Sequence, residues 1–312
     1  MDVDAEMPEL RALASYYAGK GGALWTAERD GAVVGMVATC PHAGGGWEIC
    51  RVYVHPSLHG SGLGHALLDT AEAHAIAAGA TRLVLWSDTR FDRAHRFYEK
   101  RSYVRAGPVR VLQDISNSLE YGYAKPVDGI AVLDAASAAS AEPRLSSMLI
   151  ACVAEGAGVS FLPPLAPDVA QAFWRETARD VAAGKKVLLA GWHGGVLAGT
   201  VTLNLATPQN QPHRAEVAKL LVDPACRRSG LARRLMQRLE QQARAAGRRL
   251  LTLDTRAGSG AEALYRGMGW QELGCIPGYA QRPDGTPDDT VFFWKRLDPM
   301  PAPDVDRESG TD

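Results

Sequence analysis

The strongest constraint on this sequence is that it contains two copies of one pattern. Residues 47–56 match residues 215–224: in each, a Glu precedes a Pro by eight residues and a basic residue follows the Glu by three. Matching tyrosines follow at Tyr98 and Tyr265, with a register change of one residue. Similarity that keeps order and spacing in this way predicts a duplicated structural unit.

The same local signals surround each copy. An apolar hairpin with an Asp-Gly or Gly-Gly turn comes first, and a Gly-rich turn, an amphipathic helix and a terminating Gly follow. Helices are predicted at residues 8–18, 65–78, 137–155, 167–183 and 233–246. Strands are predicted at residues 23–28, 32–39, 82–86, 103–107, 119–125, 129–133, 186–192, 196–204, 249–253, 270–274 and 290–297. We expect an α/β fold with domains at residues 1–126 and 127–298. The tail at 299–312 is predicted to be disordered.

Composition excludes several classes of partner. Lys and Arg number 34 against 35 Asp and Glu, so the chain has no overall basic field for nucleic acid or anionic lipid. No apolar run approaches the ~20 residues of a membrane span, and the acidic start lacks a signal-peptide core. We expect a cytoplasmic protein that binds neither nucleic acid nor membrane.

Cysteine and histidine spacing gives no sign of a metal site. The five cysteines form no C-x-x-C pair, and the eight histidines form no H-E-x-x-H motif. We therefore expect reduced thiols that mostly fill space, and no metal.

Each Gly-rich turn lies between a strand and a helix. A helix N-terminus offers unpaired N–H groups and a positive dipole end, and small residues let a diphosphate approach the main chain. The Gly-Lys-Ser/Thr of a P-loop is absent, and Gly60, Gly62 and Gly64 do not fit G-x-G-x-x-G. The alternative is a turn with a structural role alone. The Gly-rich turn is repeated with the same upstream Glu and downstream Tyr, which favours an anion-binding loop.

These loops carry a resemblance to a known family. Residues 227–232 resemble the Q/R-x-x-G-x-G/A pyrophosphate loop of the GNAT (Gcn5-related) N-acetyltransferases, and residues 59–64 are similar with His in place of Arg or Gln. The second copy also resembles tabtoxin-resistance and aminoglycoside-modifying acetyltransferases, at residues 155–161, 214–220, 253–255, 277–279 and 282–285. The resemblance implies two tandem GNAT-like domains, each a mixed, splayed central sheet flanked by helices, with acetyl-CoA as donor and an amine as acceptor.

The resemblance also implies how acetyl-CoA is held. The strand before each loop exposes backbone groups to the pantetheine arm, and the loop N–H groups take the diphosphate. The implied cofactor-binding residues are Leu221, Val222, Arg227, Arg228, Ser229, Gly230, Leu231 and Ala232 in the second copy and Tyr53, Val54, His59, Gly60, Ser61, Gly62, Leu63 and Gly64 in the first.

Acyl transfer to an amine needs a base for the amine and an acid for the departing thiolate. The resemblance implies Tyr98 and Tyr265 as the acids, with simple packing against the cofactor as the alternative. Glu48 and Glu216 occupy the family's general-base position, and their alternative is a solvent-facing or salt-bridged strand Glu. Asp254 is either an acceptor-side carboxylate or a helix cap.

The acceptor pocket is predicted in the second copy, at residues 156–165 and at Trp174, Tyr279 and Asp284, where the aromatics are either core or pocket. The first copy lacks the matching first strand, helix and loop Arg, so we expect the chemistry mainly in the second. The expected activity is acetyl transfer to a primary amine of a small molecule, an antibiotic or toxin in its sharpest version. Protein acetylation, and a non-catalytic CoA sensor or scaffold, remain open, as does the oligomeric state.

Overall fold

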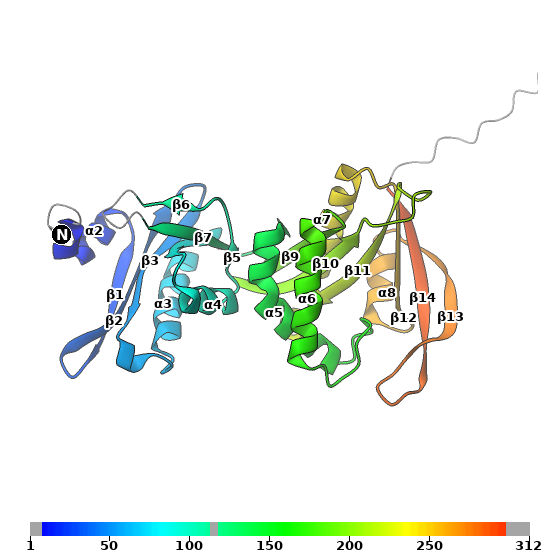
Figure 1. Cartoon of the computed structure of the whole chain (residues 1–312), viewed down its shortest axis with the longest axis horizontal. Helices are drawn as coiled ribbons and strands as arrows, with labels where there is room; N and C mark the ends of the chain where they lie inside the picture. The colour runs from blue at the N-terminus through cyan, green and yellow to red at the C-terminus, as the bar shows by residue number, and fades with distance from the viewer. Residues whose placement is uncertain (1–7, 113–117, 298–312) are drawn as a thin grey trace, which may run out of the picture.

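The computed structural model describes residues 8–112 and 118–297, which form two α/β domains in tandem (Figure 1). The predicted fold class is confirmed, and the predicted tail at residues 299–312 lies outside the described residues. Each domain is built on one mixed sheet. Among the described residues, no helix has the length and apolarity that crossing a membrane requires.

The first domain has the strand order β1-β2-β3-β4-β7-β5, with β6 paired to β7. Its elements are η1 (Pro8–Arg11), α2 (Leu13–Gly19), β1 (Ala23–Arg29), β2 (Ala32–His42), β3 (Gly46–Val54), η2 (Pro56–Leu58), α3 (Leu63–Ala77), β4 (Arg82–Asp88), α4 (Asp92–Lys100), β5 (Val104–Arg105), β6 (Arg110–Val111) and β7 (Leu119–Pro126). The apolar stripe of α3 packs on the sheet through Leu67, Leu68, Ala71 and Ala75.

The second domain has the order β13-β14-β12-β11-β10-β9-β8. Its elements are β8 (Gly129–Leu133), α5 (Ala135–Ala154), α6 (Pro167–Ala182), β9 (Lys186–His193), β10 (Val196–Asn204), β11 (Arg214–Val222), η3 (Pro224–Cys226), α7 (Leu231–Ala245), β12 (Leu250–Arg256), α8 (Gly260–Arg266), β13 (Gln271–Gln281) and β14 (Pro287–Arg296). Among the residues described before β1, which begin at residue 8, helices α5 and α6 have no long counterpart, and the elements there are η1 and the short α2.

Several element boundaries differ from the sequence expectation. Helices α3 and α7 begin two residues earlier than predicted, because Gly62 and Gly230 serve as their N-caps in the left-handed conformation. Strand β13 continues well past the predicted end at residue 274. Pro277 and Gly278, which usually end a strand, lie instead in an irregularity of the pairing with β14 between Ile276 and Ala280.

The two central parallel strands pair over only a short stretch in each domain. Strand β11 pairs with β12 from Arg214 to Glu216, yet β11 continues to Val222. Strand β3 likewise pairs with β4 only as far as Glu48 and continues to Val54. The strands splay beyond the two glutamates, which leaves one edge of each long strand without a sheet partner.

A bulge in the long strand accompanies each splay. Lys219 has φ 53° and Arg51 has φ 55°, a left-handed conformation that is uncommon for residues other than glycine. The partner strands show a matching register shift, between Thr200 and Thr202 in β10 and at the equivalent place in β2. An extra residue of this kind bends a strand, which accounts for the departure of β11 and β3 from their parallel neighbours.

A buried ion pair is also repeated in the two domains. Glu72 of α3 lies 2.9 Å from the Lys125 ammonium of β7, and Glu240 of α7 lies 2.7 Å from Lys295 of β14. Glu72 additionally accepts hydrogen bonds from Arg101 and Tyr103, which follow α4. In the first domain, the pair and these hydrogen bonds therefore connect α3 to β7 and to the residues that follow α4, the helix that carries Tyr98.

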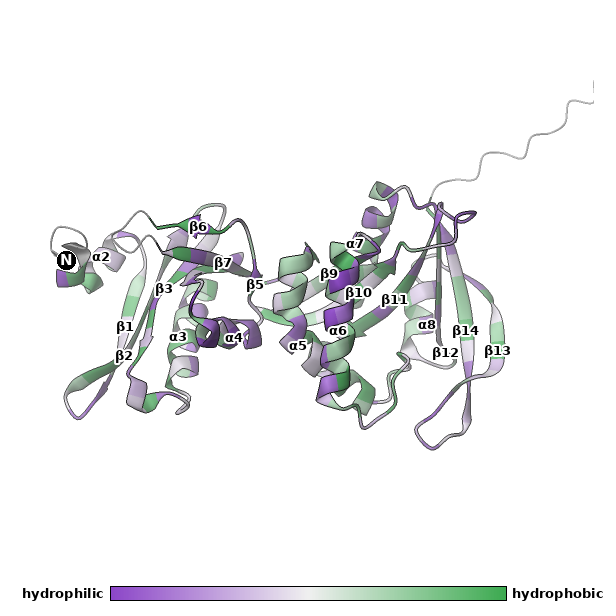
Figure 2. Ribbon diagram, in the orientation of Figure 1, coloured by the Kyte–Doolittle hydropathy of each residue, from purple (hydrophilic) through white to green (hydrophobic). Residues whose placement is uncertain are grey.

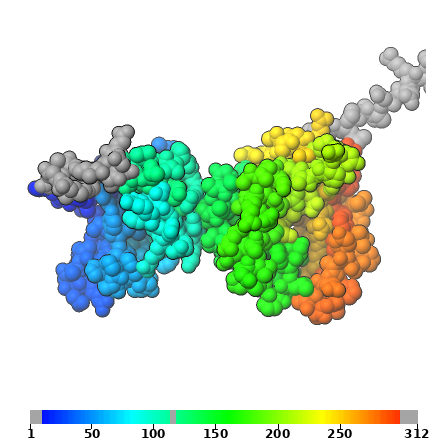
Figure 3. Space-filling view, viewed as in Figure 1, coloured from blue at the N-terminus to red at the C-terminus, as the bar shows by residue number. Residues whose placement is uncertain are grey.

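The domains meet through β5 and α5, at the narrow waist seen in Figure 3. Val104 of β5 packs into the buried cluster of the second domain. The indole of Trp192 donates to the Ser102 carbonyl at 2.9 Å, and the Arg105 amide donates to the Ser140 hydroxyl at 2.9 Å. The contact therefore reaches α5, whose C-terminal end borders the cavity of the second domain.

We expect Glu72→Ala to lower the free energy of unfolding of the first domain by about 3–5 kcal/mol, because Lys125 would remain buried without its counter-charge. Urea unfolding followed by circular dichroism measures this change. The matched control is Glu176→Ala, which removes an exposed ion pair with Arg179 and should cost less than about 1 kcal/mol. Equal costs for the two variants would contradict the structural role of the buried pair.

Candidate functional site

A cavity of about 750 Å³ opens in the second domain where β11 leaves β12. Five segments converge on it: the splayed part of β11, the Gly-rich loop with the start of α7, the end of β12, helix α8, and the loop after α5. Its walls comprise Cys152, residues 155–160, 217–222, 227–233 and 254–256, residues 259–261, Leu264 and Tyr265. The cavity thus brings together two predicted features, the Gly-rich loop and Tyr265, that are distant in the sequence.

The loop end of the cavity suits a diphosphate. Gly230 is the N-cap of α7 with φ 78°, and no side chain caps the N–H groups of the first helical turn. A Cβ at Gly230 would meet no atom within 4 Å, so the space beside these N–H groups is open. Arg227 and Arg228 add positive charge, and Arg227 is held by Glu155 at 2.6 Å.

The Tyr265 hydroxyl is a proton donor at neutral pH. The side chain is 5% exposed and packs against the rings of Trp270 and Phe293. Burial, with a smaller contribution from the charge of Asp254, raises the pKa of Tyr265 well above its ordinary value. The phenol therefore stays protonated and lies close enough to Asp254 to feel its charge.

Two carboxylates border the other end of the cavity. Asp254 lines the wall and is exposed, and in the described part of the chain its side chain has no hydrogen-bond or ion-pair partner. It does not cap α8, whose N-cap is Ser259. Glu216 is exposed just outside the wall, at the last residue that pairs with β12, and its cross-strand partner is Asn204. The Asn204 side-chain oxygen is buried without a hydrogen-bond partner among the described residues, which provides a place for an ordered water.

Lys219 also lines the cavity, although the sequence pattern indicated it only as the basic residue that follows the repeated glutamate. Its ammonium donates to the Ser160 hydroxyl at 3.2 Å and lies near the rings of Phe161 and Phe173. Burial lowers the pKa of Lys219, and the negative charge of Asp254 partly opposes this effect. The sequence signal for this residue was its place three positions after Glu216. Its contact with the loop at Ser160 could not be predicted, because it depends on the bulge in β11.

The first domain has an equivalent cavity of about 910 Å³ with a more basic wall. Helix α4, which is hydrophilic along most of its length (Figure 2), forms much of that wall. The basic side chains of the wall are His59, His65, Arg90, Arg93, Arg96 and Lys100. Arg93 donates to His59 Nδ1 at 3.1 Å, and His59 Nε2 donates to the Val54 carbonyl at 3.1 Å, so a cation from α4 stands where the second domain has a loop Arg.

The residues of the first domain that correspond to Asp254, Tyr265 and Glu216 have different surroundings. Asp88, the counterpart of Asp254, accepts two hydrogen bonds from the Arg90 side chain and one from its backbone. These bonds hold the pKa of Asp88 well below its usual range. Tyr98 lines the cavity, and burial raises its pKa to about 12. Glu48 lies outside the cavity wall, 3.9 Å from His42.

Some predicted residues lie away from the two cavities. Trp174 is 1% exposed and belongs to the core. Tyr279 is exposed and packs on Phe292, and Asp284 accepts hydrogen bonds from Thr286 in the β13–β14 turn. Of the predicted acceptor loop, residues 156–160 line the cavity. In the first domain the cavity wall includes Val54, His59, Gly60, Gly62 and Gly64 but not Tyr53, Ser61 or Leu63.

Comparison with known families gives two matches along the chain. The family described as Acetyltransferase (GNAT) family matches residues 3–103 and residues 159–270. The two matched segments contain the two Gly-rich loops and the two splayed strands.

Parts of the chain are also similar to curated relatives and to solved structures. An uncharacterized N-acetyltransferase of Azospirillum brasilense is 34% identical over 106 residues, covering 33% of this chain and 61% of the relative. One of Mycobacterium tuberculosis (strain H37Rv) is 33% identical over 101 residues, covering 32% and 64%. The chain thus spans under two thirds of the length of either relative. The structure of Salmonella typhimurium yncA with its cofactor acetyl-CoA has 20% identity and a TM-score of 0.47, covering 57% of this chain and 98% of that one.

We expect Asp254→Asn to lower the pKa of Lys219 further, because the charge that opposes its desolvation is removed. Reductive methylation with ¹³C-formaldehyde followed by an NMR pH titration measures this pKa, and Lys219→Arg identifies the signal. The control is Asp69→Asn, which removes a carboxylate of the first domain and should leave the signal unchanged. An unchanged or raised Lys219 pKa in Asp254→Asn would contradict the proximity of the two groups.

Proposed function

Because this chain belongs to the acetyltransferase (GNAT) family, we propose that it transfers an acetyl group from acetyl-CoA to a primary amine of a small molecule, with the chemistry in the second domain. The observation that carries the proposal is the single cavity that joins the α7 N-terminus to Tyr265 and Asp254. Bound acetyl-CoA would supply the acetyl group as an activated thioester.

The second domain has the groups needed to hold that donor. The open N–H groups at Gly230 and Leu231 and the charges of Arg227 and Arg228 suit its diphosphate. The unpaired edge of β11 between Val217 and Val222 suits its extended pantetheine arm, because a strand edge without a sheet partner offers free N–H and C=O groups. Both features line one cavity, so a single extended molecule can contact them together.

The acceptor amine would be held and deprotonated by carboxylates. Asp254 is exposed to the cavity without a partner of its own among the described residues, so it is free to attract an ammonium group. Glu216 is the candidate base, acting through a water on the buried Asn204 oxygen. Burial keeps the Tyr265 hydroxyl protonated, so it can give its proton to a departing thiolate.

The ionic contacts favour the second domain over the first as the place where the acceptor amine binds. Asp88 is engaged by the side chain of Arg90, whereas Arg256, which follows Asp254 as Arg90 follows Asp88, donates to the Gly156 carbonyl. The acceptor carboxylate is therefore free only in the second domain. Helix α5, which reaches the cavity wall at Cys152, and helix α6 also have no long counterparts among the residues described before β1.

The test is acetylation of a panel of small amines by the purified chain, followed as release of free CoA thiol. We expect Tyr265→Phe to lower kcat by about 10²-fold or more, the usual contribution of a general acid. Tyr98→Phe is the matched change in the first domain and should have the smaller effect, since that domain holds its acceptor carboxylate in an ion pair.

The reverse order of the two effects would assign the chemistry to the first domain. Equal rates in wild type, Tyr265→Phe and Glu216→Gln would contradict the assigned roles. Binding of acetyl-CoA without turnover of any amine would favour a sensor, and turnover of a peptide alone would favour a protein acetyltransferase.

A further inference from the structure

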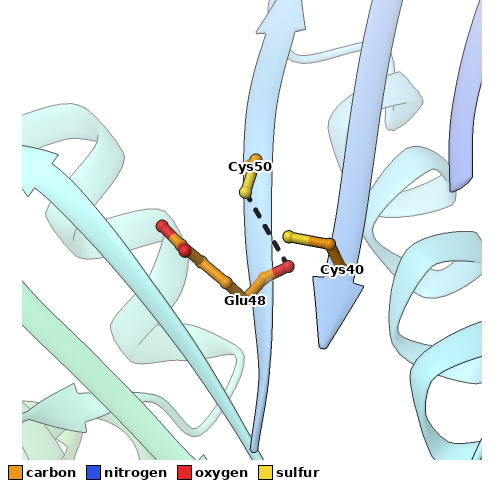
Figure 4. Close-up of side chains that lie close together, drawn as sticks. All are labelled: Cys40, Glu48 and Cys50. Atoms are coloured by element: carbon orange, nitrogen blue, oxygen red, sulfur yellow. Dashed lines mark hydrogen bonds between the residues drawn. The ribbon is translucent and has the colours of Figure 1, made fainter. Parts of the chain in front are cut away.

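Two cysteines and a glutamate meet on the first-domain sheet, outside the cavity of that domain. Cys40 of β2 and Glu48 and Cys50 of β3 each offer a ligand atom, and these atoms all lie within 4.8 Å of one another. Figure 4 shows the sulfur atoms of Cys40 and Cys50 between neighbouring strands, with Cys50 Sγ donating to the Glu48 backbone carbonyl at 3.8 Å and the Glu48 side chain extending away from Cys40. No cysteine spacing in the sequence indicated this group, because the strand pairing creates it.

The sheet register explains why the three side chains share one face. Cys40 is the cross-strand partner of Glu48, and Ala38 is the partner of Cys50. Residues two apart on one strand point to the same side of a sheet. His42, two residues beyond Cys40, lies next to Glu48, with its Nδ1 atom 3.9 Å from a Glu48 carboxylate oxygen.

These separations suit one metal ion better than a disulfide. Ligand atoms at about 2.0–2.3 Å from a tetrahedral ion lie about 3.3–3.8 Å from each other, and the ligand atoms of Cys40, Glu48 and Cys50 all lie within 4.8 Å of one another. Cys40 and Cys50 are diagonal neighbours across the two strands. Diagonal Cα atoms lie about 7–8 Å apart, beyond the usual limit of about 7 Å for a disulfide without backbone movement.

Positive charge and a buried cluster surround the group. Lys20, the residue that follows α2, brings positive charge near Cys40. Tyr17 of α2 covers Cys40 in a small buried cluster, so one side of the group is closed to water. Arg51 also contacts Tyr17 and brings a second positive charge to a site that would hold two thiolates and a carboxylate.

The second domain lacks this group although its backbone is the same. The strand pairing places Asn204 and Ala218 where the first domain has Cys40 and Cys50, around the matching glutamate. Ala218 there lines the wall of the cavity. The matching positions of the repeat thus carry two thiols in the first domain and an amide and a methyl group in the second.

We propose that Cys40, Glu48 and Cys50 bind a thiolate-preferring divalent cation such as Zn²⁺, with His42 as the fourth ligand. Two sulfur ligands with one carboxylate and one imidazole select zinc over magnesium or calcium, which prefer oxygen ligands throughout. Four protein ligands leave no open position, so the ion would stabilise the sheet rather than activate a water.

The test is a titration of the reduced, metal-free full-length chain with Zn²⁺ by calorimetry, and with Co²⁺ by absorption spectroscopy. We expect one Zn²⁺ per chain and, for Co²⁺, the thiolate charge-transfer and d–d bands of a tetrahedral site. Removing a residue that only orients a metal ligand already weakens metal binding about 10–100-fold. Cys40→Ser and Cys50→Ser each remove a proposed ligand, so each should weaken zinc binding by at least about 100-fold. Glu48→Gln should weaken it with less risk to folding, because this side chain is partly exposed.

Cys275→Ser is the matched control, because it removes an exposed thiol of the second domain and should leave zinc affinity unchanged. Melting curves without metal establish that each variant is folded. Zinc affinity equal in wild type and a Cys40→Ser/Cys50→Ser double variant would overturn the proposal. A Cys40–Cys50 disulfide found by mass spectrometry in the reductant-treated chain would overturn it as well.

Discussion

The short parallel pairing at the centre of each sheet is the constraint from which the rest of the structure follows. Strands β11 and β12 share only the pairs from Arg214 to Glu216, and the bulge at Lys219 then bends β11 away. A sheet that stayed paired would fill this space with backbone hydrogen bonds. Because it separates instead, an unpaired strand edge, a helix N-terminus and the side chains of β12 and α8 face one cavity. The buried Glu240–Lys295 pair fixes α7 against the sheet and so keeps that opening in place.

The two copies keep this frame and differ in the side chains placed on it. Asp254 is open to its cavity, whereas Asp88 is held by Arg90. Glu216 faces an asparagine with a buried, unpartnered oxygen, whereas Glu48 lies among two thiols and an imidazole. The two domains thus share one backbone geometry with different side-chain surroundings, and β5 and α5 are in contact where the domains meet.

Features that depend on local chain chemistry could be predicted from the sequence. The duplication, the helices that end before Gly79 and Gly247, and the fold class rest on periodicity and glycine placement, and the structure confirms them. Side-chain environments could not be predicted, because they depend on pairing between distant strands. The approach of Cys40 to Cys50 arises from the register of β2 and β3, and the ion pair of Asp88 with Arg90 depends on side-chain rotamers that the sequence pattern does not specify. Tyr279 lies outside the cavity because β13 runs on through Pro277 instead of ending.

The central claim is that the α7 N-terminus binds the diphosphate of acetyl-CoA, and calorimetric titration of the Gly230→Asp variant with CoA tests it most directly. The account predicts at least about tenfold weaker binding, or about 1.4 kcal/mol, because a carboxylate would enter the open space beside the first-turn N–H groups. Gly247→Asp is the matched control, with the same left-handed backbone and open surroundings at the far end of α7, and should bind as the wild type does. Undiminished CoA affinity in Gly230→Asp would contradict the account.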